Sequence, residues 1–361
     1  MPKLNESLTL RSGITLKNRL FVPPMTVVLS FHDGAITTDE VNHYAEISQG
    51  SGLVITGTAN VTENGKGWPG ELSVTDDSMI EGLSRIAKAI QDKGAKAILQ
   101  IFHAGRMSSS KTIGEQVVSA SAIPAEMPGA EIPRELSEAE ILEIIEAFGQ
   151  ATRRAIAAGF DGVEIHGANT YLIQQFFSEH SNRRNDAWGG SLEKRANFPK
   201  AVTKRVFEEV EKADRPFAVG YRLSPVEATT PGIRLEDSLY LIDELKAFPL
   251  DYLHVSLKSY DRKSNSPELQ EKSELAYIHD RIDGAFPLLA VGGVRDRVAA
   301  EGILEDAELA GVAQQTLVDP SFAQKLLDDR DAEIVTKPFA EAIYDLPMAH
   351  PKLKYLERRY L

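Results

Sequence analysis

The segment Gly159-Phe-Asp-Gly-Val-Glu-Ile-His-Gly-Ala-Asn-Thr-Tyr171, near the middle of the chain, predicts a buried strand that ends in three polar side chains. Residues 161–165 are apolar-biased and rich in β-branched residues, as in a parallel strand that is covered on both faces. His166, Asn169 and Tyr171 follow where such a strand would pass into its loop. Because the carboxyl ends of the strands form the catalytic face of a (β/α)8 barrel, the segment favours that fold and a site on that face.

These three side chains offer two neutral hydrogen-bond donors and one phenol. Such a set suits holding a carbonyl or phenolate oxygen while a proton is delivered beside it. Taken singly, His166 is equally explained as a paired core histidine, Asn169 as a turn former and Tyr171 as a packing aromatic. Three polar groups at one strand end are costly to bury unless they are paired or used, so we interpret them together as catalytic.

Strand patterns alternate with amphipathic helical patterns along nearly the whole chain. The expected strands are Arg19–Pro23, Leu53–Thr58, Ala97–Phe102, Asp161–Ile165, Phe217–Arg222, Asp251–Val255, Pro287–Val291 and Leu309–Ala313. Capping-box patterns predict helix starts at Thr37, Ser78 and Ser137. Eight strands alternating with helices predict an α/β fold, a single (β/α)8 TIM barrel domain over residues 1–361.

The chain is longer than the roughly 250 residues of a plain barrel. We expect the surplus in long loops at the C-terminal face, residues 104–134 and 171–190, and in a C-terminal extension at about 332–361. This extension would pack on the barrel or on a neighbouring subunit.

A doubly wound sheet is the alternative fold, and it needs a glycine-rich turn between its first strand and a helix. The chain has one GxGxxG pattern, Gly65-Lys-Gly-Trp-Pro-Gly70. This pattern contains a proline and opens no helical pattern, so it predicts an irregular loop after the second barrel strand rather than a dinucleotide site.

Composition narrows the kinds of partner. Forty basic and 53 acidic residues give a net charge of −13, which disfavours nucleic acid or an anionic membrane as the main partner. The chain has no cysteine, which excludes disulfides, thiol catalysis and cysteine-ligated metals. Its eight histidines form no metal-binding pattern, so we expect no metal. We see no signal peptide or membrane span and expect a cytoplasmic protein.

Polar residues and prolines also mark other strand ends. Gln100 lies inside an apolar strand, where its amide needs both donors and acceptors; a backbone pairing or the edge of a planar polar ring would supply them. Pro23 and Pro24 have no amide donor, so they end the first strand and leave Thr26 at its mouth, although a plain surface turn is an equal alternative.

Three further segments complete the expected barrel rim. Arg222 ends the fifth strand, and residues 291–296 and 310–315 follow or contain the seventh and eighth. Glycines and helix N-termini in that region commonly bind phosphate in this fold, with plain turns as the alternative. Residues 181–191, together with Arg195, predict a buried Arg–Asp network that anchors a loop to the rim.

Together these motifs resemble the Old Yellow Enzyme family of FMN-dependent ene-reductases, over almost the whole chain from Leu16 to Pro320. The most specific motifs are Gln100-x-x-His103-x-Gly105-Arg106, His166-x-x-Asn169-x-Tyr171, and Ser181-Asn-Arg-Arg-x-Asp-x-Trp-Gly-Gly-Ser191 with Arg195. The resemblance implies FMN as cofactor and NADH or NADPH as hydride donor.

The resemblance also implies roles for individual residues. The cofactor-binding set would be Pro23, Pro24, Met25, Thr26, Thr58, Gln100, Arg222, Gly292, Gly293, Ala313 and Gln314. Within it, Thr26 would face the O4/N5 edge of the flavin, Arg222 its N1/O2 edge, and Gly292 onward the phosphate. His166 and Asn169 would hold the electron-withdrawing oxygen of the substrate, and Tyr171 would protonate the substrate.

The chain departs from the family pattern at the phosphate. Where the family usually has Gly-Arg, this chain has Ala313-Gln314, so we expect weakened FMN binding unless another basic residue such as Arg295 takes that role. The absence of cysteine excludes the dienoyl-CoA-reductase branch, which carries an iron–sulfur cluster.

The C-terminal segment, residues 352–361, is basic and aromatic in an otherwise acidic chain. One interpretation is a solvated final helix turn. The other follows bacterial members of the family: Arg358 or Arg359 would reach the site of a neighbouring subunit in a homo-oligomer.

The functional hypothesis is an FMN-dependent NAD(P)H oxidoreductase that reduces the activated C=C bond of enones and enals in a ping-pong cycle and binds phenolic ligands. Two alternatives are a flavin oxidase or dehydrogenase with oxygen or another electron acceptor, and a barrel that only binds. The polar cluster at Tyr171 disfavours the last of these.

Overall fold

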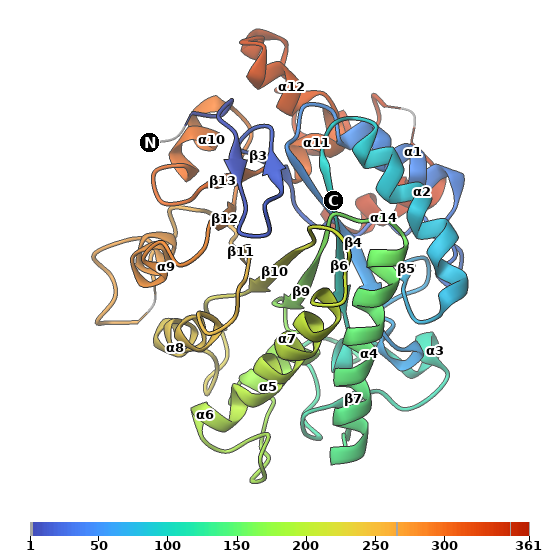
Figure 1. The fold of residues 1–361 in the computed structure, drawn as a ribbon, viewed down its shortest axis with the longest axis vertical. Helices are drawn as coiled ribbons and strands as arrows, with labels where there is room; N and C mark the ends of the chain where they lie inside the picture. The colour runs from blue at the N-terminus through green and yellow to red at the C-terminus, as the bar shows by residue number, and fades with distance from the viewer. Residues whose placement is uncertain (1–2, 265, 347, 361) are drawn as a thin grey trace.

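The computed structural model describes residues 3–264, 266–346 and 348–360, and its centre is a closed barrel of parallel strands surrounded by helices (Figure 1). The barrel strands are β3 (Leu20–Val22), β4 (Leu53–Asn60), β6 (Lys96–Phe102), β9 (Gly162–Gly167), β10 (Ala218–Leu223), β11 (Tyr252–Val255), β12 (Leu288–Val291) and β13 (Leu309–Gly311). The predicted TIM barrel is therefore confirmed, and each expected strand overlaps an observed one.

The barrel closes because its first strand pairs with two neighbours. In β3, Leu20 is in register with Ala310 of β13, and Phe21 is in register with Leu53 of β4. A short strand, β5 (Leu72–Ser73), adds to the end of β4 outside the ring. All pairings within this sheet are parallel, so the carboxyl ends of the strands meet at one end of the barrel.

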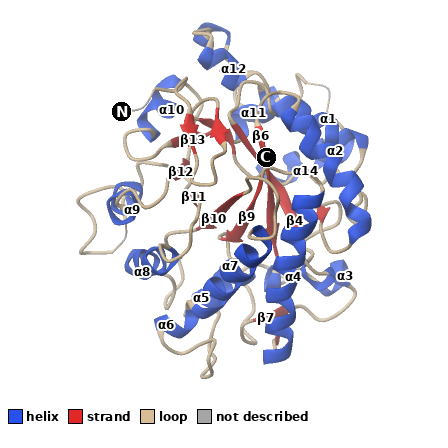
Figure 2. Ribbon diagram, viewed as in Figure 1, coloured by secondary structure: helices blue, strands red, loops and turns tan. Residues whose placement is uncertain are grey.

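Helices cover the outside of the ring, as Figure 2 shows by colour. The helices that follow the eight strands are α1 (Thr38–Ile47), α2 (Ile80–Gln91), α4 (Glu138–Ala157), α7 (Asn197–Val210), α8 (Leu235–Leu245), α9 (Glu274–Ile282), α10 (Arg297–Ile303) and α12 (Phe322–Leu327). Shorter helices lie in the loops and the tail: α3 (Ser110–Ile113), α5 (Leu172–Phe177), α6 (Leu192–Arg195), α11 (Gln314–Val318), α13 (Phe339–Ala342) and α14 (His350–Tyr360). None of the helices described is long and apolar enough to cross a bilayer.

Of the three predicted capping boxes, one is complete. Ser137 and Glu140 cap α4 reciprocally. Thr37 caps α1 by accepting from the amide of Glu40, but the Glu40 carboxylate turns away to the hydroxyl of Ser30.

The predicted helix start at Ser78 is wrong. Asp76 caps a 3-10 turn there and accepts a hydrogen bond from the amide of Ser78. Helix α2 then begins two residues later, at Ile80. The carboxylate of Asp76, and not the side chain of Ser78, therefore caps the turn that leads into α2.

A hairpin closes the amino-terminal end of the barrel. Its strands are β1 (Leu8–Thr9) and β2 (Thr15–Leu16). Leu10, Ile14 and Leu16 are buried in one apolar cluster with residues from the lower part of the barrel, such as Phe21 and Leu289. The barrel is therefore sealed at this end, and a ligand site lies at the opposite end.

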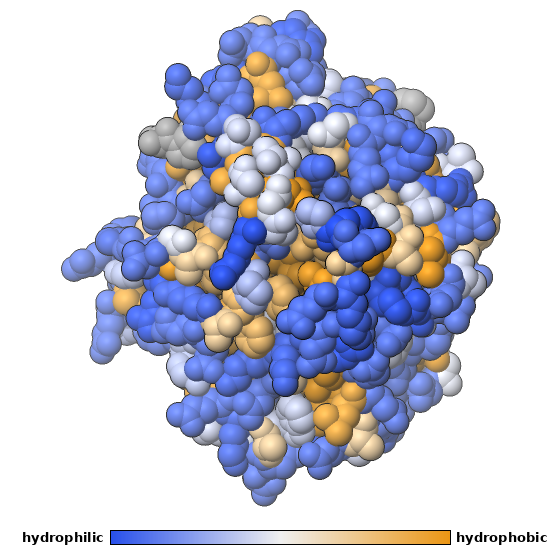
Figure 3. Space-filling model, in the orientation of Figure 1, coloured by the Kyte–Doolittle hydropathy of each residue, from blue (hydrophilic) through white to orange (hydrophobic). Residues whose placement is uncertain are grey.

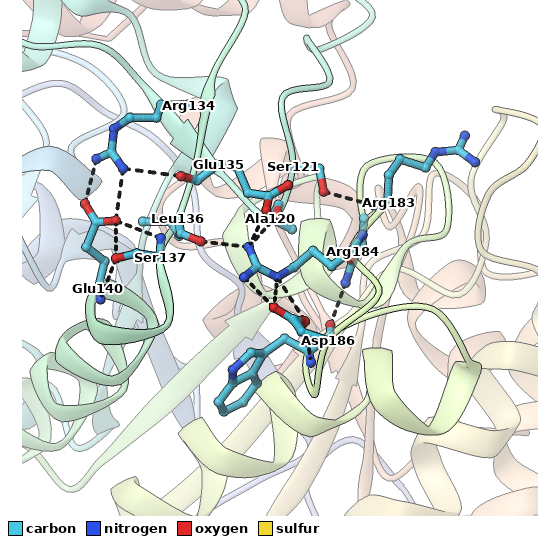
Figure 4. A network of polar contacts seen from close by, with 12 residues as sticks. Ala120, Ser121, Arg134, Glu135, Leu136, Ser137, Glu140, Arg183, Arg184 and Asp186 are labelled. Atoms are coloured by element: carbon cyan, nitrogen blue, oxygen red, sulfur yellow. Dashed lines mark hydrogen bonds and ion pairs between the residues drawn. The ribbon is translucent and has the colours of Figure 1, made fainter.

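A polar network ties the loop after β9 to the rim (Figure 4). Arg184 pairs with Asp186, with Nη2 2.6 Å from Oδ2. Its Nη1 donates to the carbonyls of Ala120 and Leu136, which flank the strands β7 (Val118–Ser119) and β8 (Arg134–Glu135) of the long loop after β6. The predicted Arg–Asp anchor is confirmed.

Arg195 anchors the same loop from its far end, donating to the carbonyls of Phe177 and Gly190. The glycine-rich segment 65–70 lies in a loop after β4 and opens no helix. The doubly wound alternative is thereby excluded.

Candidate active site

A cavity of about 920 Å³ lies at the carboxyl ends of the barrel strands. Most of the residues expected from the sequence line it: Pro23, Pro24, Met25, Thr26, Asn169, Tyr171, Arg222, Gly292, Gly293, Ala313 and Gln314. Figure 3 draws one face of the molecule, which is mainly hydrophilic with apolar residues near the centre of the view. The volume is within the usual range for a cofactor site.

The other three expected residues lie beside or below this cavity. Thr58 lines a small adjoining pocket together with Met25 and Thr26. His166 and Gln100 are buried inside the barrel. The structure thus brings the expected residues to one end of the barrel, with Gln100 deepest.

His166 is held as a neutral hydrogen-bond donor. Its Nδ1 lies 3.3 Å from the amide nitrogen of Ala168, which donates to it, so the ring proton belongs on Nε2. Burial lowers the pKa of His166 well below its usual value, and the positive charge of Arg222 lowers it further. His166 therefore offers an N–H without a positive charge at neutral pH.

Asn169 is oriented by two serines. It has a left-handed backbone conformation, with φ of 56°, which asparagine tolerates better than most residues. Its Oδ1 accepts hydrogen bonds from Ser256 at 3.0 Å and from Ser224 at 3.4 Å. Because the oxygen is occupied, the Nδ2 group remains as the donor for a ligand.

Tyr171 is clamped by three aromatic rings. Its ring lies edge-on to Phe102 and to His166, each at 5.0 Å between centroids, and 6.4 Å from Trp68. Burial raises the pKa of Tyr171, and the nearby Glu71 raises it further. The phenol therefore stays protonated at neutral pH, as a proton donor must be.

A chain of hydrogen bonds joins Arg222 to this group. Nη2 of Arg222 donates to the hydroxyl of Ser256 at 3.1 Å, and that hydroxyl donates to Asn169. Arg222 is only 6% exposed and is the next-to-last residue of β10. It thus places a buried positive charge at the inner wall of the cavity.

The donor and acceptor groups around the cavity fit an FMN ring. The buried polar atoms that lack a partner within the described chain include Thr58 Oγ1, Gln100 Oε1 and Arg222 Nε. Buried polar groups normally find a partner, and a polar molecule bound beside these three atoms would supply one. One hydroxyl, one amide oxygen and one cationic N–H match a flat ring with mixed donors and acceptors at its edge.

The loop after β12 fits a phosphate. Gly292 and Gly293 have φ of 144° and 81°, values that other residues rarely adopt. A side chain at Gly292 would collide with the backbone of Tyr260, whereas the space around Gly293 is open. Lys258, which was not expected from the sequence, follows β11 and adds a positive charge to the cavity lining, as does Arg295.

At the phosphate end, Gln314→Arg is expected to tighten FMN binding by about tenfold or more. A charged hydrogen bond contributes about 1.5–3 kcal/mol, and about 1.4 kcal/mol is one decade in affinity. The measurement is a titration of apo-protein with FMN. Arg295→Gln serves as the matched test of compensation: a large loss in this variant, with no gain from Gln314→Arg, would show that Arg295 already holds the phosphate.

The C-terminal helix α14 lies against the same cavity of its own chain. Tyr355 and Arg359 are among the lining residues. Lys352 is buried, and its Nζ donates to Nδ1 of His43 in α1 at 3.0 Å. The basic segment seen in the sequence therefore approaches the site within one chain.

Docking of α14 is expected to strengthen as the pH rises above 8. Burial lowers the pKa of Lys352 to about 8 from 10.5, so between these values the undocked helix holds the extra proton and a rise in pH favours docking. One pKa unit corresponds to about 1.36 kcal/mol, which predicts a gain of roughly 2 kcal/mol or more.

Hydrogen exchange of the α14 amides, corrected for the intrinsic rate, measures this change. The Lys352→Met variant is the control, because its protection should not vary between pH 8 and 10. Equal pH dependence in both proteins would contradict the role of Lys352.

Comparison with known proteins identifies the family. The model of the NADH:flavin oxidoreductase / NADH oxidase family matches residues 3–333. The probable NADH-dependent flavin oxidoreductase YqiG of Bacillus subtilis is 43% identical across 92% of this chain and 90% of that protein. The NADH:acrylate oxidoreductase of Vibrio harveyi is 46% identical across 91% of this chain but 33% of that protein. This chain therefore spans about a third of the length of that relative.

Solved structures agree with the family assignment. The Old Yellow Enzyme homologue of Zymomonas mobilis has a TM-score of 0.82 and 25% identity, with 98% of both chains covered. Morphinone reductase has a TM-score of 0.80 and 27% identity, with 97% of this chain and 98% of that chain covered.

The fold and site thus define a flavin-dependent barrel oxidoreductase. The chain belongs to the NADH:flavin oxidoreductase family of Old Yellow Enzyme type. Its cofactor is FMN, with NADH or NADPH as reductant. Among the residues described, no group of three potential ligands could hold a metal ion.

Proposed function

We propose that this protein reduces the activated C=C bond of α,β-unsaturated carbonyl compounds with electrons from NAD(P)H, in a ping-pong cycle. The observation that carries the proposal is the convergence of two neutral donors and one protonated phenol at the inner end of the cavity. FMN, when bound, would supply the chemistry of hydride transfer between the nicotinamide and the substrate.

The residues of the chain supply orientation and the proton. His166 Nε2–H and Asn169 Nδ2–H would hold the carbonyl oxygen, which gains negative charge as the C=C bond is reduced, so preorganised donors lower the barrier. Tyr171 would deliver the proton to the carbon next to the carbonyl, as a general acid. Phe102 and Trp68 pack against its ring and hold it in place.

Cofactor contacts would come from two sides. Thr58, Gln100 and Arg222 would bind the flavin ring through their unpartnered atoms. Gly292, Gly293, Ala313 and Gln314 would surround the phosphate end.

Names of relatives support an activated alkene as acceptor. Relatives from Vibrio harveyi and Klebsiella pneumoniae are named NADH:acrylate and NADH:fumarate oxidoreductase. Acrylate and fumarate are both α,β-unsaturated acids, so the substrates of this chain would include carboxylates as well as enones and enals.

A second candidate function is an NADH oxidase or dehydrogenase that passes electrons to oxygen or another carrier. The relatives from Vibrio harveyi and Klebsiella pneumoniae favour this candidate, because the segment that matches this chain makes up only 33% and 36% of their length. An NADH oxidase of Thermoanaerobacter brockii is 33% identical over half of its own length. In such proteins the acceptor need not be a free alkene.

The test begins with the visible spectrum, because oxidised FMN makes the purified protein yellow. Steady-state rates with NADH are then compared for cyclohexenone, acrylate and oxygen. Faster turnover with an alkene supports the first function, and faster turnover with oxygen supports the second. A colourless protein that takes up no FMN on incubation would contradict both.

A further inference from the structure

A buried carboxylate lies inside the barrel directly beneath the site. Glu164 of β9 is fully buried. Its Oε1 accepts from Nε2 of Gln100 at 2.6 Å, and its Oε2 lies 3.0 Å from Nδ1 of His254 in β11. Nothing in the proposed reaction uses Glu164, yet two side chains from different strands converge on it.

The register places Glu164 one layer below the cavity wall. Gln100 is in register with Glu164, and His166 is in register with Arg222 and, one strand further, with His254. Inward-facing residues of one strand are two apart, so Glu164 lies just below His166. The carboxylate therefore sits under the ring of residues that face the cofactor.

Charge balance indicates a partnership with Arg222. An arginine stays charged in a protein, and a buried charge without a counter-charge is strongly destabilising. The described lining of the large cavity contains no carboxylate. Burial lowers the pKa of Arg222, and the Glu164 carboxylate is the first of the negative groups that oppose this effect.

Hydrogen bonding shows what else Glu164 fixes. Nε2 of Gln100 donates to Glu164, and the backbone amide of Gln100 donates to the hydroxyl of Thr56. The side-chain oxygen of Gln100 has no partner in the described chain. Burial lowers the pKa of His254, so its ring is neutral and its single proton belongs on Nδ1, facing a carboxylate. Glu164 thus turns an acceptor atom of Gln100 toward the ligand.

We propose that Glu164 is a positioning residue that orients Gln100 and partly offsets the charge of Arg222, and thereby holds the reduction potential of the bound flavin down. The inference rests on the proposed binding of FMN beside Arg222. A positive charge near the flavin favours the reduced, more negative form, and a carboxylate behind that charge weakens the effect.

The test is the flavin midpoint potential of Glu164→Gln, which keeps the shape and removes the charge. We expect the equilibrium to shift toward the reduced flavin by about tenfold, which is about +30 mV for a two-electron couple. Glu164→Asp keeps the charge and should stay near the wild-type potential. Tyr221→Phe, which removes a buried hydroxyl from the same strand as Arg222 without changing charge, is the matched control.

An unchanged or lower potential in Glu164→Gln would overturn the inference, while a flavin-loaded wild type would leave the proposed function standing. A second measurement needs neither the variant nor the flavin: 15N NMR of histidine-labelled wild-type protein. We expect His254 to carry its proton on Nδ1. A proton on Nε2 alone would make Glu164 a neutral acid that donates to Nδ1, and this result would also overturn the inference.

Discussion

Tyr171→Phe is expected to slow the reduction of an enone by about 10²–10⁴-fold, the usual loss when a general acid is removed. Bleaching of the flavin by NADH should keep nearly its wild-type rate, because the phenol acts on the substrate carbon and not on the nicotinamide. The ring contacts with Phe102, His166 and Trp68 involve no hydroxyl, so the phenylalanine should pack in the same place. Stopped-flow measurement of each half-reaction separates the two steps.

The matched control is Tyr240→Phe, which removes a phenol on the outer helix α8. It should leave both half-reactions unchanged. Equal slowing of both steps in Tyr171→Phe would show that the residue shapes the cofactor site instead of supplying the proton.

The second large effect is expected from His166→Ala and Asn169→Ala. Loss of one preorganised donor to a developing negative oxygen typically costs about 10²–10³-fold in turnover. Because both donors would act on the same oxygen, the double variant should lose less than the product of the two single losses. The same variants should bind a para-substituted phenol weakly, as followed by its charge-transfer band with oxidised flavin in a spectral titration.

Ser224→Ala and Ser256→Ala extend this test to the orientation of the amide. Each serine hydroxyl donates to Oδ1 of Asn169. Their removal should produce smaller losses than Asn169→Ala. Phenol binding as tight as in the wild type, in the double alanine variant, would refute the donor pair.

The barrel was predictable because it depends on a repeated local signal. Each strand is a short apolar run, and each helix has an amphipathic pattern, so the alternation survives errors of one or two residues at the ends. Helix starts were less predictable, because a capping residue competes with its neighbours. The carboxylate of Asp76 accepts the hydrogen bond from the amide of Ser78, and the hydroxyl of Ser30 donates to the carboxylate of Glu40.

The location of the candidate site could be predicted from the sequence because the ends of the strands could be predicted. Parallel strands bring their carboxyl ends together, so His166, Asn169 and Tyr171 had to lie near the residues that follow the other strands. Contacts across the barrel depend on register and side-chain direction instead. The sequence contains no sign that Glu164 meets a histidine 90 residues away, or that Lys352 meets one 309 residues away.

The pairing that closes the ring has a consequence for synthesis of the protein. The first and last barrel strands, β3 and β13, are joined through residue pairs such as Leu20 and Ala310. The first strand can pair with β4 early, but a ribosome must release almost the whole barrel before that strand meets its second partner, β13. Until then the emerging sheet has open edges, which are templates for association with other chains. A nascent chain stopped before Leu309 is expected to depend on chaperones and to aggregate when they are absent.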